Sequence, residues 1–523
     1  MKRNLLFFLF VFFIGLSLFA QPLSTPEIDK LVERTMKTFQ VPGMAVAVIK
    51  DGKVVHSKGY GVSSLNTGRK VDEQTLFGIA SNSKAFTAAT LGILVDEKKL
   101  SWNDKVIQYI PEFRLYNSYV TEDFTIRDLL THRSGMGLGA GDLMIWPDSS
   151  DFQIKDIIYN LRFLKQTSPF RTKYDYDNLL YMVAGEVVTR VSGMSWEQFV
   201  EERIMNPLAM NRSAASYARL KDKTNVIEGH SVVDKKLQVV PRHDLKEGQC
   251  AAGGIYSGIS DLSKWMICQL ENGKYGENLE KQIFSPSVQR EMWSAQTNMP
   301  VRTDKYNSHF NAYGLGWRLT DVNGTKEVSH TGGMEGMVTQ VTLFPEMKLG
   351  IVVLTNQESG AAFLSVTNTI KDSYLGLTPE DWVLRFDTLG SKSEKQDEEL
   401  TRQIQEEIEN ALSQDGKRPD VQVFSGEYTD HWLGKVTVSE RNGKLWFHSA
   451  RSPQLKGEMS FYKGNTFAVR WVSRSMKADA FVLFNLDQEG KARGFQMKAI
   501  SPLTDFSYDF HDLDFKRNDL VTK

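Results

Sequence analysis

The sequence predicts an α+β protein, in which an antiparallel sheet flanked by helices and carrying an inserted all-α subdomain is followed by a small all-β domain. Three observations predict this arrangement. Hairpin patterns lie far apart in the chain, at 44–54 and at 338–355. Helical stretches broken by proline and glycine fill the interval from about 75 to 220. Short strands separated by turns begin after residue 420.

Length and charge set the first limits on function. The chain has 523 residues, with 63 Lys+Arg and 64 Asp+Glu, and a formal net charge of −1. This is ordinary globular composition, with length for roughly two to four domains. A near-neutral chain offers no basic surface for a phosphate backbone, so nucleic acid is not an expected partner.

Residues 1–20 have the pattern of a secretory signal peptide. Lys2 and Arg3 precede the apolar run 5–16, and Ala20 offers a cleavage position. The run and its continuation hold about 15 apolar residues, fewer than the roughly 20 that a membrane-spanning helix needs. We therefore expect an exported protein, periplasmic or secreted, with no stable membrane span after cleavage.

The first domain is expected to cover residues 21–390. Apolar residues recur at helical spacing over 28–39, and the first hairpin follows directly. The second hairpin has Pro345 in its turn and lies near the end of the domain. The sheet is therefore built from both ends of one domain, with the helices inserted between them.

Residues 391–420 differ from the rest of the chain in composition. They carry nine acidic and five basic side chains and no aromatic residue. A narrow apolar stripe recurs every four residues, at Leu400, Ile404, Ile408 and Leu412. We interpret this segment as an acidic linker helix with a solvated charged face.

Residues 421–523 form the expected second domain. Their short strands are separated by turn sequences such as Asn442-Gly443 and 487–490. A barrel-like all-β domain of about 100 residues fits this pattern. No residue in this domain indicates a functional site.

Cysteine and histidine give no sign of a metal site. Cys250 and Cys268 could form one disulfide in an exported protein, but two buried thiols are the simpler expectation. The nine histidines show no ligand spacing such as H-E-x-x-H. We expect neither a metal nor another cofactor.

Ser81 and Lys84 form an S-x-x-K pair where a loop becomes a helix. Residues three apart share one helical face, which brings the lysine amine next to the hydroxyl. Serine is a weak nucleophile that needs an adjacent base, and a desolvated lysine can be that base. The positive end of the helix favours negative charge on the serine oxygen and lowers the lysine pKa. Alone, the pair fits a capping serine with a solvated lysine equally well.

A second element is Tyr176-Asp177-Asn178, which precedes an apolar helical run. A phenol beside a lysine can share its proton and act as a general base. The Asn178 amide can orient a substrate carbonyl or the lysine. Alone, this tripeptide fits a surface tyrosine and a helix N-cap.

The third element is His330-Thr331-Gly332-Gly333, just before the expected strand 338–344. Glycines let a substrate backbone approach a strand edge closely, and such an edge offers unpaired N–H groups. The N–H groups of Ser81 and Gly333 would form an oxyanion hole. Alone, this segment fits a tight turn with a bystander histidine.

Together and in this order, the three elements resemble those of the penicillin-recognising serine hydrolases. These comprise class C β-lactamases, D-Ala-D-Ala carboxypeptidases, D-aminopeptidases and related esterases. The resemblance covers about 30–375 and implies the sheet with an inserted α domain described above. It continues in the segments 125–136 (TIRDLLTHRSGM), 206–210 (NPLAM), 252–254 (AGG) and 313–317 (YGLGW).

The resemblance also implies roles for individual residues. Ser81 would be the acylated nucleophile, with Lys84 and Tyr176 as the proton-shuttling pair. Asn178 would bind the substrate carbonyl, and His330-Thr331 would form the third motif. His132, not included among the catalytic residues, resembles a structural loop residue.

One residue departs from the class C pattern. Class C β-lactamases usually have lysine where this chain has His330, and H-T-G is more similar to the D-stereospecific peptidases. A neutral imidazole attracts a substrate carboxylate less than an ammonium does, and its charge ordinarily changes near pH 6.5. The C-terminal domain is similar to lipocalin-like or uncharacterised β modules appended to some of these hydrolases.

We therefore expect an exported serine hydrolase that forms an acyl-enzyme on Ser81. Its substrate would be a small peptide, amide or ester. D-configured peptides and fragments of the cell wall are among the candidates. Two alternatives stay open, a class C-type β-lactamase and a non-catalytic sensor of muropeptides or penicillin. An α/β-hydrolase is excluded because the chain has no G-x-S-x-G elbow. Oligomeric state is open.

Overall fold

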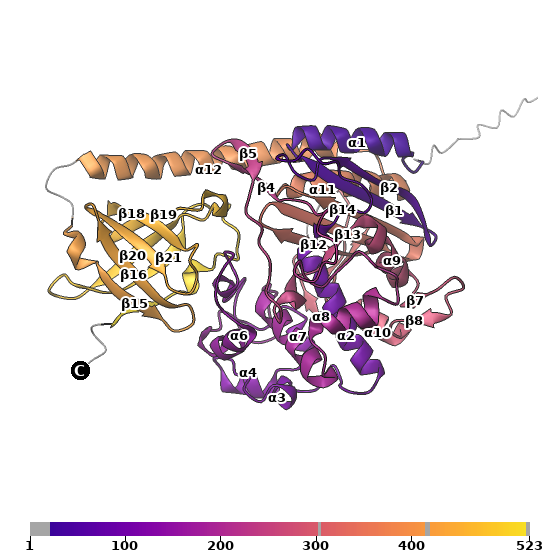
Figure 1. The fold of residues 1–523 in the computed structure, drawn as a ribbon, viewed down its shortest axis with the longest axis horizontal. Coiled ribbons are helices and arrows are strands. Elements are labelled where there is room, and N and C mark those ends of the chain that lie inside the picture. Colours follow the sequence, from indigo (N-terminus) through magenta and orange to yellow (C-terminus); the bar gives the residue numbers. More distant parts are fainter. Residues whose placement is uncertain (1–20, 302–304, 414–418, 519–523) are drawn as a thin grey trace, which may run out of the picture.

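The computed structural model describes residues 21–301, 305–413 and 419–518. The expected signal peptide, 1–20, lies outside these residues. None of the helices within the described ranges is long and apolar enough to cross a membrane. Figure 1 shows a larger mixed domain and a smaller barrel, with one long helix running along both.

The larger domain is built on an antiparallel sheet of eight strands in the order β2-β1-β14-β13-β12-β11-β10-β9. Met44 of β1 lies opposite Thr355 of β14, so the two predicted hairpins meet at one seam of the sheet. The strand bounds are β1 (Gly43–Lys50), β2 (Lys53–Gly61), β9 (Thr297–Asn298), β10 (Asn311–Tyr313), β11 (Arg318–Val322), β12 (Thr325–Met334), β13 (Met337–Phe344) and β14 (Leu349–Thr355).

The central strands are apolar throughout because helices cover both faces of the sheet. Successive strand residues point to opposite faces, and β1 follows this rule. Val46 and Val48 pack in one core cluster, with residues of α1 (Thr25–Thr38) and α11 (Gly360–Tyr374). Ala45 and Ala47 belong to the other, with α2 (Ser83–Asp96) and α9 (Ile259–Leu270).

The inserted helical region places α2 at the centre of the domain, against α7 (Asn178–Ser192). Every residue of α2 from Ser83 to Leu94 is buried, so the helix has no solvent face. The remaining helices there are short, and three small hairpin or bridge pairs complete the domain. Their bounds are α3 (Val106–Tyr109), α4 (Ser118–Asp123), α5 (Ile126–Leu129), α6 (Ile154–Asn160), α8 (Trp196–Val200), α10 (Pro286–Met292), β3 (Phe77–Gly78), β4 (His230–Val233), β5 (Lys236–Val239), β6 (Tyr256–Ser257), β7 (Lys274–Tyr275) and β8 (Lys281–Gln282).

The two cysteines are both buried and carry free thiols, so the possible disulfide is not formed in this structure. Burial raises the pKa of Cys268 to about 12 and raises that of Cys250 as well. Both side chains therefore behave as small apolar residues of the core.

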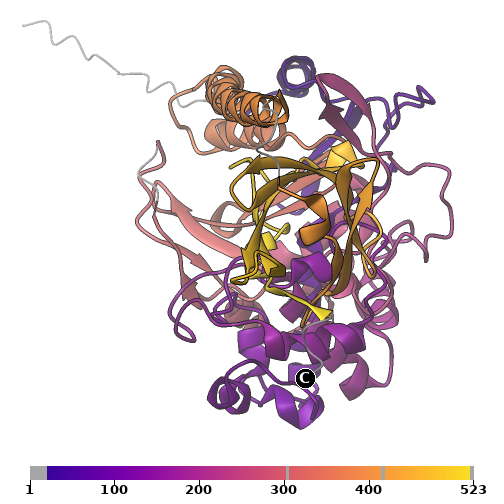
Figure 2. The same ribbon diagram turned by 90° about the vertical axis from the view of Figure 1, so that its left-hand side faces the viewer.

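The C-terminal domain is a closed barrel of strands β15 to β22 in sequence order (Figure 2). Aromatic side chains fill its interior, with the rings of Phe495 and Phe515 only 4.4 Å apart. The barrel is thus a packed core, with its loops free for contacts outside. Its strands are β15 (Gly426–Asp430), β16 (Gly434–Arg441), β17 (Lys444–Ser449), β18 (Lys456–Lys463), β19 (Thr466–Trp471), β20 (Ala480–Leu486), β21 (Ala492–Ala499) and β22 (Phe515–Arg517).

Helix α12 (Trp382–Ser413) begins before the expected linker and is more than a solvated connection. Ile404 and Ile408 are buried against Ala468 of the barrel, and Leu400 packs against the same cluster. The stripe is narrow because only one line of the helix touches the barrel. The side chain of Leu412 lies outside the described part of the chain.

Replacing Ile404 tests this contact. The side chain is 8% exposed, so we expect Ile404→Ala to lower the free energy of unfolding by about 2 kcal/mol, through lost burial and a cavity. Leu389→Ala is the matched control, because Leu389 lies on the same helix and is 53% exposed; its effect should stay within about 0.5 kcal/mol. Chemical denaturation followed by tryptophan fluorescence measures both. Equal stability of the two variants would contradict a buried stripe.

Candidate active site

Ser81 lies in a tight 3-10 turn, Ala80–Asn82, directly before helix α2. Ala80 has a positive φ of 47°, a conformation that costs energy for a residue with a side chain. The turn places Ser81 at the wall of a large cavity. Local sequence thus puts the hydroxyl at the N-terminal end of a buried helix.

Lys84 is completely buried behind Ser81. Its Nζ lies 3.0 Å from Ser81 Oγ, 2.8 Å from Asn178 Oδ1 and 2.8 Å from the Ala252 carbonyl oxygen. Burial lowers the pKa of Lys84 to about 7, and the negative charge of Asp142 opposes this shift. A neutral amine is therefore accessible at ordinary pH.

These three contacts decide where the lone pair of the neutral amine points. The Ala252 carbonyl and Asn178 Oδ1 can only accept hydrogen bonds, so they take the two hydrogens of the amine. The lone pair then faces Ser81 Oγ, which can donate to it. This is the geometry of a base activating a nucleophile.

Tyr176 lines the same cavity as Ser81. Its ring centroid is 4.8 Å from Lys84 Nζ. Burial raises the pKa of Tyr176 well above its ordinary value, against a smaller opposing effect of a hydrogen bond with Ser81. The phenol therefore keeps its proton, and Lys84 is the better base of the pair.

His330 lies within strand β12 rather than in a turn before a strand. Its Nδ1 donates to the Thr331 carbonyl oxygen at 2.6 Å, so in the neutral ring Nε2 accepts from the Tyr313 hydroxyl at 2.8 Å. Burial lowers the pKa of His330 well below 6.5, and the charge of Arg318 adds to this effect. His330 is neutral at ordinary pH, and its charge change is displaced from the value near 6.5 expected of a free imidazole.

The rest of the third motif forms the free edge of β12 facing Ser81. Strand β11 pairs with β12 as far as Arg318 opposite Ser329, and beyond this point no other described strand pairs with β12 on that side. Gly332 packs so tightly that a Cβ there would lie 2.1 Å from the Ile79 carbonyl oxygen. A Cβ on Gly333 would meet only Val338, at 3.9 Å. Thr331 and Gly333 both line the cavity.

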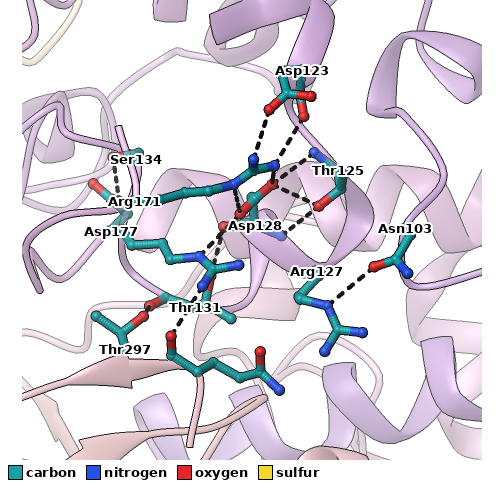
Figure 3. Close-up of polar contacts among 12 residues, drawn as sticks. Asn103, Asp123, Thr125, Arg127, Asp128, Thr131, Ser134, Arg171, Asp177 and Thr297 are labelled. Atoms are coloured by element: carbon teal, nitrogen blue, oxygen red, sulfur yellow. Dashed lines mark hydrogen bonds and ion pairs between the residues drawn. The ribbon is translucent and has the colours of Figure 1, made fainter. Parts of the chain in front are cut away.

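An ion-pair network centred on the buried Asp128 supports the segment that carries Tyr176 (Figure 3). Asp128 is fully buried and accepts hydrogen bonds from Arg133 Nε at 3.0 Å and Arg171 Nη2 at 2.6 Å. Arg171 also binds Asp123 at 2.6 Å. Since removing one partner of a buried ion pair is strongly destabilising, these charges fix the loop before Tyr176.

His132 connects this support to the site. Its Nδ1 accepts a hydrogen bond from the Asp177 backbone N–H at 3.0 Å, and its ring centroid lies 4.1 Å from that of Tyr176. Burial, with the charge of Lys84, lowers the pKa of His132 well below 6.5. The neutral ring packs behind the phenol and lies outside the cavity lining, as a structural residue would.

Arg318 is a candidate site residue that the sequence patterns did not reveal. It lines the cavity, together with Tyr174 and His330. Its Nε is buried and has no hydrogen-bond partner among the described residues. A guanidinium in such a place can bind a carboxylate or another anionic group of a substrate. The only sequence signal was its position directly after the YGLGW segment.

The cavity has a volume of about 2190 Å³ and reaches from Ser81 to the barrel and helix α12. Typical small-molecule pockets have about 300–1,000 Å³. Phe506 of the barrel lies edge-on to Tyr176, with ring centroids 5.7 Å apart. Within the described ranges, no group of three or more His, Cys, Asp or Glu side chains could hold a metal ion.

Comparisons with known proteins show which family the chain belongs to. The sequence model of the Beta-lactamase family matches residues 28–374, and a domain of unknown function, DUF3471, matches 420–517. The chain therefore belongs to the beta-lactamase family. The fold is that of the β-lactamases and transpeptidases, followed by a closed barrel.

Three relatives illustrate the range of the family. "Unguisins hydrolase ungD'" of Aspergillus campestris is 30% identical over 400 residues, covering 74% of this chain and 70% of that one. "Protein flp" of Staphylococcus aureus is 25% identical, covering 64% of each chain. The octameric penicillin-binding protein homologue from Pyrococcus abyssi has the same fold, with a TM-score of 0.60 at 22% identity over 94% of this chain and 100% of that chain.

The two glycines of the third motif give a matched test of the site geometry. We expect Gly332→Ala to reduce kcat/KM for p-nitrophenyl acetate about 100-fold, because the methyl group must push β12 away from the turn that carries Ser81. Gly333→Ala should retain activity within about threefold, because the space there is open. Steady-state hydrolysis of both variants checks this, and equal losses would contradict the close packing of β12 on that turn.

Proposed function

We propose that this protein is an exported serine hydrolase that forms an acyl-enzyme on Ser81 and passes the acyl group to water. The observation that carries the proposal is the 3.0 Å contact between Ser81 Oγ and the buried Nζ of Lys84. Its substrate is a peptide, amide or ester, with D-configured peptides and amides first. Export rests on the signal-like residues 1–20, and cleavage would leave Gln21 as the first residue.

The catalytic cycle moves one proton among Ser81, Lys84 and Tyr176. The Lys84 amine takes the proton of Ser81 while Oγ attacks the substrate carbonyl and forms a tetrahedral adduct. Backbone N–H groups of Ser81 and Gly333 would bind its oxyanion, a contribution worth about 10²- to 10³-fold per donor. The proton then passes from Lys84 through the Tyr176 phenol to the leaving amine or alcohol. A water molecule repeats the steps on the acyl-enzyme and restores Ser81.

Two features support a peptide or amide over a small β-lactam. The cavity is larger than a small molecule needs. Neutral His330 brings no ammonium to the place where class C enzymes usually have lysine. The Aspergillus relative is named as a hydrolase, which supports turnover over sensing.

A panel of substrates tests the assignment. D-Ala-D-Ala peptides, D-aminoacyl amides, p-nitrophenyl esters and nitrocefin are incubated with wild type and with Ser81→Ala. We expect wild type to hydrolyse the esters and at least one D-configured amide, with nitrocefin slowest, and Ser81→Ala to lose about 10⁴-fold or more in kcat. Nitrocefin as the best substrate would favour the β-lactamase alternative, and binding with no turnover of any compound would favour a sensor.

The pH dependence tests the role of the lysine. Only the neutral amine can accept the serine proton, and the pKa of Lys84 is about 7. We therefore expect kcat/KM to be low at pH 5, to rise through about pH 7 and to reach a plateau near pH 8. Stopped assays with p-nitrophenyl acetate over pH 5–9 measure the profile. A rate that still rises steeply between pH 8 and pH 9 would point to a lysine with an ordinary pKa.

A further inference from the structure

A segment of the barrel between β21 and β22, residues 500–514, reaches the catalytic cavity. Asp505, Phe506, Ser507 and Tyr508 are among the cavity-lining residues. The Phe506 carbonyl is so close to the larger domain that a Cβ on Gly139 would lie 2.6 Å from its oxygen. The barrel thus contacts the loop at Gly139, which leads directly into the 141–143 turn.

Asp509 fastens that loop. Its side chain is fully buried, and its two oxygens accept backbone hydrogen bonds, from Gly141 N–H at 2.6 Å and from Leu143 N–H at 3.1 Å. These two N–H groups flank Asp142. One carboxyl group from the barrel therefore holds the turn on both sides of that residue.

Asp142 passes the constraint to the catalytic lysine. Its Oδ2 accepts a hydrogen bond from Asn178 Nδ2 at 2.7 Å, while Asn178 Oδ1 accepts from Lys84 Nζ at 2.8 Å. The carboxyl group thereby fixes the orientation of the amide. With the amide reversed, its NH₂ group would face the amine and compete with Ser81 for the lone pair.

Among the groups that face Lys84, Asp142 is the acidic one that affects the lysine pKa. Lys84 is also faced by Tyr176, Tyr181 and His132, all neutral at ordinary pH because burial opposes their ionised forms. Asp142 is the charge that raises the lysine pKa. His330, from β12, is neutral as well.

Asp142 itself is subject to several influences. Burial raises its pKa to about 7, and the nearby charge of Asp505 adds to this shift. Hydrogen bonds with Asn178 and Ser507, and the charge of Lys84, favour its ionised form. Buried Asp177 and Asp509 have raised pKa values, in part because of the charge of Asp142. Asp142 and Lys84 therefore titrate as a coupled pair.

We propose that the barrel is part of the catalytic apparatus: Asp509 is a positioning residue that holds the 141–143 turn, so that Asp142 sets the Asn178 amide and directs the Lys84 lone pair at Ser81. This inference rests on the proposed role of Lys84 as the base. It assigns a task to a domain in which no sequence motif indicated a site. The barrel is required for efficient acylation even though it supplies none of the groups that react.

The test compares two isosteric substitutions of buried aspartates in the barrel. Asp509→Asn replaces one accepting oxygen with an NH₂ group, which cannot take a backbone N–H. Asp430→Asn is the control, because Asp430 is buried and accepts backbone N–H groups from Trp432 and Leu433, both at 2.9 Å, and from Asp514 at 3.0 Å, at the end of the 500–514 segment that does not line the cavity. Asp430 is not among the cavity-lining residues. The readout is the rate at which a fluorophosphonate probe phosphonylates Ser81, with loss of fluoride, in the full chain from pH 5 to 9.

We expect Asp509→Asn to lower the maximal rate of Ser81 labelling about tenfold or more and to move the acidic limb of the profile to lower pH. The direction follows because Asp142 raises the pKa of Lys84, so a displaced carboxylate lets that pKa fall. Asp142→Asn should shift the limb in the same direction and further. Asp430→Asn should keep the wild-type profile even if its unfolding temperature falls.

The outcomes separate the inference from the proposed function. Wild-type profiles in both Asp509→Asn and Asp142→Asn, with only lower thermal stability, would overturn the positioning role while leaving Ser81 as the nucleophile. If wild type itself is not labelled at Ser81, the proposed function fails and the inference fails with it. If Asp509→Asn does not fold, the profile of Asp142→Asn decides whether the positioning role stands. Asp142 belongs to the same series of hydrogen bonds but lies in the larger domain.

Discussion

The burial of one amine organises this protein. Taking an ammonium out of water costs several kcal/mol unless partners compensate, and Lys84 is completely buried. Its three polar partners come from the turn of Ser81, from the start of α7 and from the segment of Ala252, which are far apart in the chain. These partners meet at one nitrogen only because α2 packs against α7 and against the segment of Ala252. The same desolvation that costs stability brings the lysine pKa to about 7.

The structure around the amine serves to hold these partners in place. Strand β12 approaches the turn of Ser81 so closely that only glycine fits at position 332. Asp128 and its two arginines hold the loop before Tyr176, and His132 packs behind the phenol. Asp128 and His132 are fully buried at the centre of these supports, which favours a single arrangement of the side chains that face the cavity.

Local patterns in the sequence predicted what local geometry determines. The spacing of Ser81 and Lys84 sets their contact, because residues three apart lie on one helical face. The two hairpin patterns predicted a sheet built from both ends of the domain, since apolar strands need partners and cover. Asn178 also followed from its place beside Tyr176.

What escaped prediction depends on contacts between distant segments. The low pKa of His330 comes from its burial inside β12, which the tetrapeptide alone does not reveal. No motif in the sequence marks Asp142 or Asp509. Their role depends on the contact between the barrel loop and the 141–143 turn. The charges of 391–420 predict a linker helix with a solvated face, and the sequence does not reveal the barrel surface that covers the apolar stripe of α12.

The central claim, that Lys84 is the base because its amine is neutral near pH 7, can be measured directly. Lysine labelled with ¹³C at Cε reports its protonation state by NMR, and Lys84→Met assigns the signal by its loss. The account predicts one lysine that titrates near pH 7, well below the ordinary value of about 10.4. A Lys84 signal that titrates above about pH 10 would contradict it.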